Sequence, residues 1–172
     1  MRPALGYAER AGKGLAPAAL TVLLVLISAL PFPLAALEDI MPFWGLMAVF
    51  YWAVFRPDLL PVWAVFLAGL LEDALSGSLF GLHALVFTGS YWIALSQRRL
   101  FTAGSFFMLW TGFGIVTTGS ALLVWAITSL ARGVVFPPGI IVAKTMTTVA
   151  VFPLLAQGLI RVQRSLARDE DP

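Results

Sequence analysis

The sequence predicts an all-α, polytopic integral membrane protein with six transmembrane helices, and three observations lead to this fold class. The 172 residues are 60% hydrophobic and 12% charged, about half of the charged fraction that soluble proteins carry. Six apolar runs alternate with short polar segments, and most basic residues then fall on one side of the membrane. The absence of cysteine excludes disulfides, thiol catalysis and cysteine-based metal sites.

The first apolar run extends from Leu15 to Leu37, after a polar segment at residues 1–14. It is long enough to cross a hydrocarbon core of about 30 Å. Pro31 and Pro33 predict that the regular helix ends near Leu30. A cleaved signal peptide is the competing interpretation. We favour a retained helix because the run is long for a signal peptide and further apolar runs follow.

The second run, Met41 to Phe55, follows an acidic turn at Glu38 and Asp39. As a helix it would rise about 22 Å, which is short for a membrane span. The helix must therefore take in residues from Ala36 onward or be shielded by neighbouring helices.

The third run, Leu59 to Leu75, begins after a break in the chain. Pro57 cannot continue the preceding helix, and Asp58 can cap the new one. The run is apolar except for Glu72 and Asp73 near its end. Acids inside a membrane helix are rare, and they are a functional hypothesis by default.

Three more runs complete the predicted bundle. The fourth extends from Leu79 to Gln97, and the fifth, from about Gly104 to Leu130, is long enough to tilt. The sixth extends from about Pro138 to Ile160, and Pro153 predicts a kink near its end. A mixed-charge tail, residues 161–172, follows.

The distribution of lysine and arginine predicts the orientation, because cytoplasmic loops carry the excess of these residues. The sequence predicts a cytoplasmic segment at 1–14, a six-helix transmembrane domain at 15–160 and a cytoplasmic tail at 161–172. The opposite side then holds Arg132, and Lys144 lies within a span. The cytoplasmic side holds nine of the eleven basic residues: Arg2, Arg10, Lys13, Arg56, Arg98, Arg99, Arg161, Arg164 and Arg168.

Four ionisable residues are expected at one depth, in the outer third of the membrane. Counted at helical rise from Pro57, Glu72 and Asp73 lie about 22–24 Å up the third helix. His83 and Lys144 lie about 8–9 Å below the same outer edge. We expect Asp73 or Glu72 to pair with Lys144, with His83 close by. We favour a structural ion-pair network over a partner-binding patch or a ligand site; a Lys144 that snorkels to the interface is a further alternative.

Three glycines are expected to serve packing and turning. Gly69 lies one turn below Asp73, where a small residue lets two helices approach closely. Gly77 and Gly81 are spaced for a tight turn and for close packing of the third and fourth helices. We expect no catalytic residue, metal or cofactor, because the single histidine lies in a span and no metal-ligand spacing or phosphate-binding glycine loop is present.

The third run and the turn after it resemble the signature of a known family. The pattern G-L-L-x-D-x-L-x-G-x-x-x-G is similar to that of the MreD family, the small membrane subunits of the bacterial rod-shape machinery, or elongasome. The residue before Asp73 is only loosely polar in the family, whereas here it is the acid Glu72. Two adjacent acids would then share one counter-charge, Lys144. The residues that carry the resemblance are Gly69, Leu70, Leu71, Asp73, Leu75, Gly77 and Gly81.

The resemblance implies a non-enzymatic scaffold subunit of the cell-elongation complex in the bacterial inner membrane. Such a subunit would bind MreC and support the MreB filament, the RodA glycosyltransferase and a class B penicillin-binding transpeptidase in peptidoglycan synthesis. It would contact membrane lipid and no nucleic acid. The resemblance also implies the six-helix fold of the S-components of energy-coupling-factor transporters. The alternative function is therefore a substrate-binding subunit of a small-molecule transporter.

Overall fold

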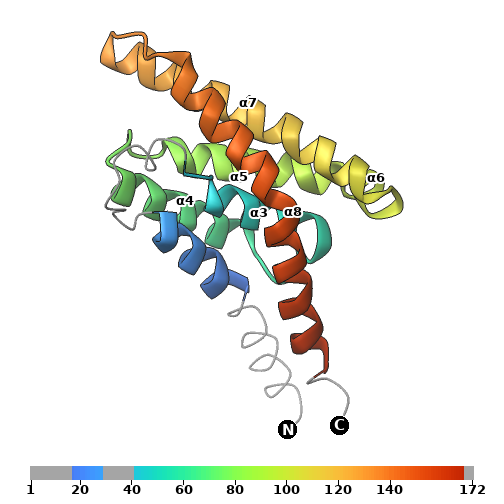
Figure 1. Cartoon of the computed structure of the whole chain (residues 1–172). Coiled ribbons are helices and arrows are strands. Elements are labelled where there is room, and N and C mark those ends of the chain that lie inside the picture. Colours follow the sequence, from blue (N-terminus) through green and yellow to red (C-terminus); the bar gives the residue numbers. More distant parts are fainter. Residues whose placement is uncertain (1–16, 29–40, 169–172) are drawn as a thin grey trace, which may run out of the picture.

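Helices account for most of the residues that the structure describes, and six of them overlap the six apolar runs. The structure is a computed structural model that describes residues 17–28 and 41–168. The first helix is called here the N-terminal helix, and the others keep the labels of Figure 1. The helices are the N-terminal helix Pro17–Ser28, α3 (Trp44–Phe55), α4 (Val62–Ser76), α5 (Leu82–Ser96), α6 (Arg98–Ala103), α7 (Phe106–Arg132) and α8 (Pro138–Arg168).

Two helices of the described chain are long and apolar enough to cross a membrane alone. They are α7, with 27 residues, and the Pro138–Arg161 part of α8, with 24. The N-terminal helix, α3 and α5 are shorter apolar helices. A helix of 12 residues rises about 18 Å, against a hydrocarbon core of about 30 Å. The shorter helices are therefore not long enough to cross such a core by themselves.

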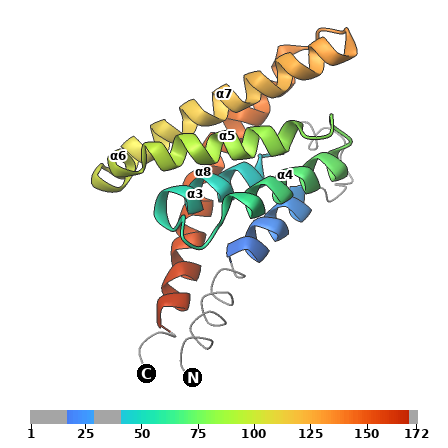
Figure 2. The same ribbon diagram turned by 180° about the vertical axis from the view of Figure 1, so that it is seen from behind.

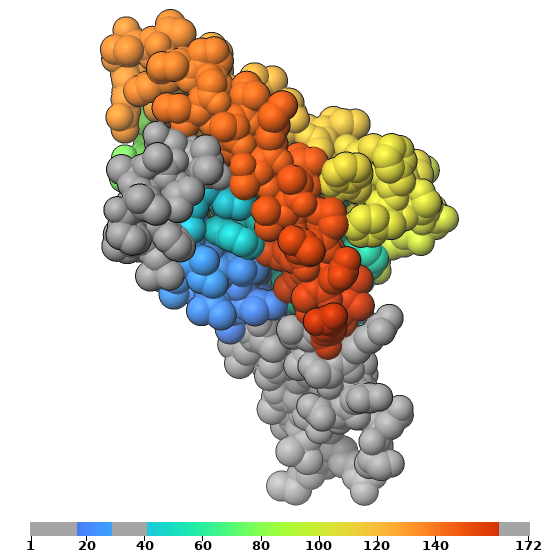
Figure 3. Space-filling model, viewed as in Figure 1, coloured from blue at the N-terminus to red at the C-terminus, as the bar shows by residue number. Residues whose placement is uncertain are grey.

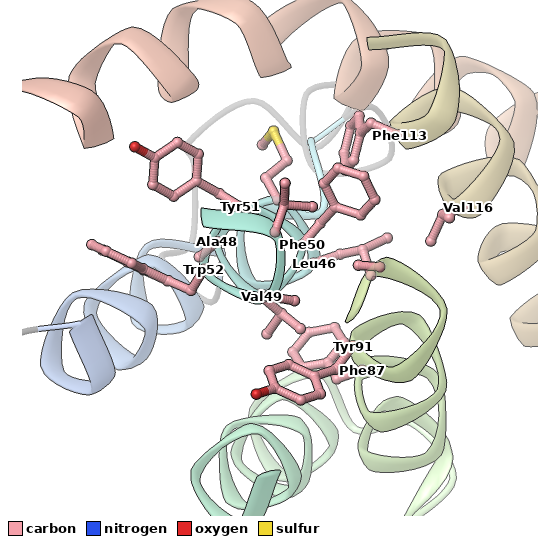
Figure 4. Close-up of a cluster of buried hydrophobic side chains, with 14 of the residues drawn as sticks. Leu46, Ala48, Val49, Phe50, Tyr51, Trp52, Phe87, Tyr91, Phe113 and Val116 are labelled. Carbon is pink, nitrogen blue, oxygen red and sulfur yellow. The ribbon is translucent and has the colours of Figure 1, made fainter. Parts of the chain in front are cut away.

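The short helix α3 lies at the centre of the molecule. Its residues from Gly45 to Val54 are all buried. In the end-on view of Figure 4, side chains of α3 point outward toward the surrounding helices, with Phe87 and Tyr91 on one side and Phe113 on another. The Phe50 ring packs edge-on against Phe113, with ring centroids 5.1 Å apart. Neighbouring helices thus shield α3 from lipid, which is one of the two solutions expected for so short a run.

The turns between helices gather at two ends of the bundle (Figures 1 and 2). The α4–α5 turn and the α7–α8 turn lie at one end, and α6 lies at the other. At the α6 end, the Arg98 Nε–H donates to the Val54 carbonyl oxygen at 2.9 Å, which satisfies a free carbonyl at the C-terminus of α3. Figure 3 shows α8 crossing one face of the bundle diagonally.

Three features differ from the sequence expectation. Asp58 does not cap the third helix, because α4 begins at Val62 and has Pro61 at its N-cap with no side-chain cap. The segment 97–103, expected as a loop, contains the short helix α6. Helix α8 continues to Arg168, past the expected end at Ile160, and keeps Pro153 inside it. Both extensions are too polar to be recognised as apolar runs, yet their residues are compatible with a helix. The expectations for residues 1–14, for Pro31 and Pro33 and for the acidic turn at 38–39 lie outside the described residues.

Candidate functional site at the turn between α4 and α5

The candidate site is built by the last turn of α4, the loop after it and the first turn of α5. Helix α4 ends at Ser76, and Gly77 takes a left-handed conformation with φ of 62°. Gly81 is also left-handed, with φ of 93°, immediately before α5. Residues with side chains rarely adopt this region, so the two glycines allow the chain to reverse within a few residues. The N-terminus of α5 consequently faces the last turn of α4.

Asp73 caps the N-terminus of α5 from the preceding helix. Its Oδ2 accepts the Gly81 N–H at 2.9 Å and the Ala84 N–H at 3.4 Å, and its Oδ1 accepts the His83 N–H at 2.9 Å. The first N–H groups of a helix have no partner within the helix, and a negative charge there also interacts favourably with the helix dipole. The residue at the N-cap position, Gly81, has no side chain to do this. Asp73 therefore replaces a local cap.

Asp73 has two further partners in the same turn. The Ser78 hydroxyl donates to Asp73 Oδ1 at 2.7 Å, and His83 Nδ1 lies 2.8 Å from the same oxygen. Asp73 is 2% exposed, and His83 is buried as well. With several donors arranged around it, Asp73 holds α4, the loop and α5 together as one unit. We call Asp73, Ser78, His83 and the two turn glycines the α4–α5 clasp.

Glu72 points to a different neighbour. Its two carboxylate oxygens lie 2.9 and 3.0 Å from the Ser28 hydroxyl, at the end of the N-terminal helix. The same hydroxyl is 2.6 Å from the Val25 carbonyl oxygen, so its single proton is shared. Consecutive residues on a helix are rotated by about 100°. The two acids therefore face different sides of α4, Glu72 toward the N-terminal helix and Asp73 toward α5.

Lys144 joins the same layer through an aromatic ring. Its Nζ lies 4.6 Å from the centroid of the Phe43 ring, a cation–π distance, and the Phe43 and His83 ring centroids are 6.4 Å apart. The lysine also attracts the Glu72 carboxylate through space. Among the described ion pairs within 4.0 Å, however, His83 and not Lys144 lies against Asp73. The expected pairing of Lys144 with Asp73 or Glu72 stays a prediction; for Asp73, the structure places His83 against the carboxylate.

Helices α4 and α5 approach each other closely at Gly69. A Cβ atom on Gly69 would lie 2.4 Å from Ala84 Cα and 2.6 Å from Ala84 N. At Gly77 and Gly81, by contrast, an added Cβ would meet nothing within 4 Å. The close packing expected of all three glycines is thus concentrated at Gly69, whereas the other two serve the turn. The close approach brings Asp73 within hydrogen-bond reach of α5.

A comparison with known families decides what kind of protein carries this clasp. The family described as rod shape-determining protein MreD matches residues 9–159. The chain belongs to the MreD family. The match includes the whole clasp, and the family expected from the residues of this turn is confirmed. Membership makes the chain a rod-shape-determining membrane protein of a family that is structural and not known for catalysis. No curated protein and no solved structure matches the chain significantly.

The structure adds residues that sequence reasoning missed in this MreD-family chain. Ser28 contacts Glu72, Ser78 contacts Asp73 and His83, and Phe43 lies against His83 and Lys144. The sequence signals that could have identified them are hydroxyl residues near a buried acid and an aromatic residue at the start of an adjacent apolar run. Among residues 17–28 and 41–168, no group of three metal-ligating side chains is present. Chemically, the site provides one buried carboxylate, Asp73, that accepts hydrogen bonds from the free N–H groups at the N-terminus of α5.

Proposed function

We propose that this MreD-family chain is a non-enzymatic scaffold subunit of the cell-elongation complex in the bacterial inner membrane. It binds MreC and thereby supports peptidoglycan synthesis and cell shape, with RodA, a class B penicillin-binding transpeptidase and the MreB filament as direct or indirect partners. The family match over residues 9–159 is the observation that carries the proposal.

The arrangement of side chains supports a scaffold. Asp73 and Glu72 accept hydrogen bonds from other helices of the same chain, and these bonds fix the positions of α4, α5 and the N-terminal helix. Helices α7 and α8 meanwhile keep many apolar side chains exposed, with Ile115 75%, Leu130 86% and Leu154 70% exposed. In a membrane, such faces contact lipid or another apolar helix. A rigid bundle with open helix faces is suited to holding a partner helix.

The proposal includes six membrane passes with cytoplasmic segments at 1–14 and 161–172. The alternation of helix ends supports it, because the α4–α5 and α7–α8 turns lie together and opposite to α6 (Figure 1). Reporter fusions after Ser78 and after Pro172 test it: the first should report the periplasm and the second the cytoplasm. A periplasmic reporter after Pro172, or both reporters on one side, would contradict the topology.

The partner is tested by capture of the tagged full chain in a mild detergent. We expect MreC to co-purify, and we expect Asp73→Ala to lower its recovery because the clasp no longer fixes α4 against α5. Arg99→Gln, an exposed change in α6, is the matched control and should leave recovery unchanged. A monodisperse wild-type protein that recovers no MreC would overturn the proposal.

The S-component-like alternative has one observation in its favour, the presence of pockets beside α7 and α8. Their volumes are about 270 and 240 Å³. Ligand sites usually enclose about 300–1,000 Å³, so these two pockets are small for a vitamin-sized substrate. The same capture experiment separates the functions, since a transporter subunit would recover an ATPase module and a small molecule in place of MreC.

A further inference from the structure

A pocket of about 270 Å³ lies between the α4–α5 turn and the end of the α7–α8 hairpin. Its lining combines polar and apolar groups. Most of its surface is apolar, and three hydroxyl-bearing residues and one arginine are also among the residues that line it. The lining includes Ser76, Ser78, Thr128, Arg132, Trp125 and Ile141.

Arg132 is the charged group of this pocket. It is the last residue of α7, where the carbonyl end of the helix dipole favours a cation, and it is exposed. Its guanidinium lies 5.9 Å from the centroid of the Phe136 ring. Within the described part of the chain, no carboxylate lies within ion-pair distance of it. The guanidinium is therefore held at the pocket by its helix and a ring while its hydrogen-bond donors remain available.

The hydroxyls around Arg132 are also available. In the described residues, the side chains of Ser76 and Thr128 make no hydrogen bond, whereas Ser78 is committed to Asp73. The Trp125 Nε1–H donates to the Phe136 carbonyl oxygen at 3.0 Å and fixes the wall of the pocket. Guanidinium and hydroxyl donors in one place are the groups that bind a phosphate oxygen.

The position of the pocket along α7 matches the headgroup region of a membrane. The 27 residues of α7 rise about 40 Å, more than a hydrocarbon core of about 30 Å. Arg132, at the end of this helix, therefore emerges from the core at the level of lipid phosphates. The apolar walls at Trp125 and Ile141 lie on the side that continues into the core. An anion with no acyl chain would leave those walls uncovered.

We propose that this pocket binds the headgroup phosphate of an anionic phospholipid, with the first methylenes of an acyl chain against its apolar walls. The volume is too small for a whole lipid, and it suits a phosphate, a glycerol and the start of one chain, the remainder lying in the bilayer. An arginine with no acid within ion-pair distance among residues 17–28 and 41–168 favours a lipid with net negative charge over a zwitterionic one. The bound lipid would bridge the clasp and the α7–α8 hairpin.

The test uses the purified full chain and native mass spectrometry with phosphatidylglycerol, with phosphatidylcholine of the same chains, and with glycerol 3-phosphate. We expect phosphatidylglycerol to bind best and glycerol 3-phosphate not to bind. Arg132→Gln should weaken phosphatidylglycerol binding about fivefold, the usual contribution of one basic residue near an anionic surface. Arg99→Gln removes the same charge at the opposite end of the bundle and should change binding little. Equal losses in the two variants, or no preference for phosphatidylglycerol, would overturn the proposal.

A second measurement does not depend on how well a variant folds. A phosphatidylglycerol with a photoreactive group near its glycerol should label wild-type peptides from residues 124–141 when irradiated in nanodiscs. Labelling spread evenly over the lipid-facing helices would contradict a built site. Competition by glycerol 3-phosphate would assign the pocket to a soluble phosphate compound in place of a lipid.

Discussion

Replacing Gly69 by alanine should separate α4 from α5. The new Cβ would lie 2.4 Å from Ala84 Cα, whereas ordinary contacts begin at 3.4 Å, so the two backbones must move apart by about 1 Å. The Asp73 hydrogen bonds of 2.9 Å to the first turn of α5 would then lengthen beyond bonding distance. Overpacking costs about 1–3 kcal/mol, and a lost charge-assisted hydrogen bond costs about 1.5–3 kcal/mol. We expect a total loss of about 3 kcal/mol or more.

Thermal unfolding in one detergent, followed by the fluorescence of the six tryptophans, measures this loss. A loss of 3 kcal/mol corresponds to a Tm lower by roughly 6–12 °C for a protein of this size. Gly89→Ala is the matched control, because a Cβ at this helical glycine meets nothing within 4 Å. That variant should gain about 0.5–1 kcal/mol from its greater helix preference. Equal Tm values for the two variants would refute the argument that Gly69 sets the distance between the helices.

Two other predictions concern the clasp. In a double-mutant cycle on Tm, Asp73→Asn and His83→Phe should couple by about 0.5–3 kcal/mol, because these two side chains are in contact. Asp73→Asn and Lys144→Met should couple less strongly, and a stronger coupling with Lys144 would make the lysine the main partner of Asp73. Gly77→Ala and Gly81→Ala should each lower the free energy of unfolding by about 1–2 kcal/mol, because both backbones are left-handed. Gly77→Asn should be less harmful than Gly77→Ala, and an unchanged Tm in both alanine variants would argue against strain in the turn.

The sequence predicted the positions of the helices well and the contacts of the site only in part. Apolar runs and their breaks locate helices because burial in lipid requires continuous apolar surface and a satisfied backbone. Helical rise also placed Asp73, His83 and Lys144 at a common depth. Rise gives no information about rotation around the helix axis, so it could not show that Asp73 faces α5 and Glu72 faces the N-terminal helix. The left-handed turn at Gly77 and Gly81, which sets that rotation, is a property of the folded loop.

The length of the second apolar run also could not show which helices would shield α3. A run of 15 apolar residues is compatible with a thin membrane region, a longer helix or a shielded one. The choice depends on aromatic contacts from residues far along the chain, such as Phe113 and Phe152, whose rings are stacked with centroids 3.9 Å apart beside Phe50. Such contacts follow from the packing of helices that no local pattern specifies.

The complete enclosure of α3 has a consequence for biosynthesis. The Phe43 N–H at the start of α3 donates to the Thr148 hydroxyl of α8 at 3.1 Å, across 105 residues of sequence. At about 5–20 residues per second, a ribosome delivers Thr148 roughly 5–20 s after Phe43. For the first part of that time neither α7 nor α8 exists to pack against α3, and Thr148 of α8 comes last, although α3 is too short to span the core alone. Nascent chains that end before α7 should therefore be degraded, and the last two helices should determine when the protein becomes resistant to proteases.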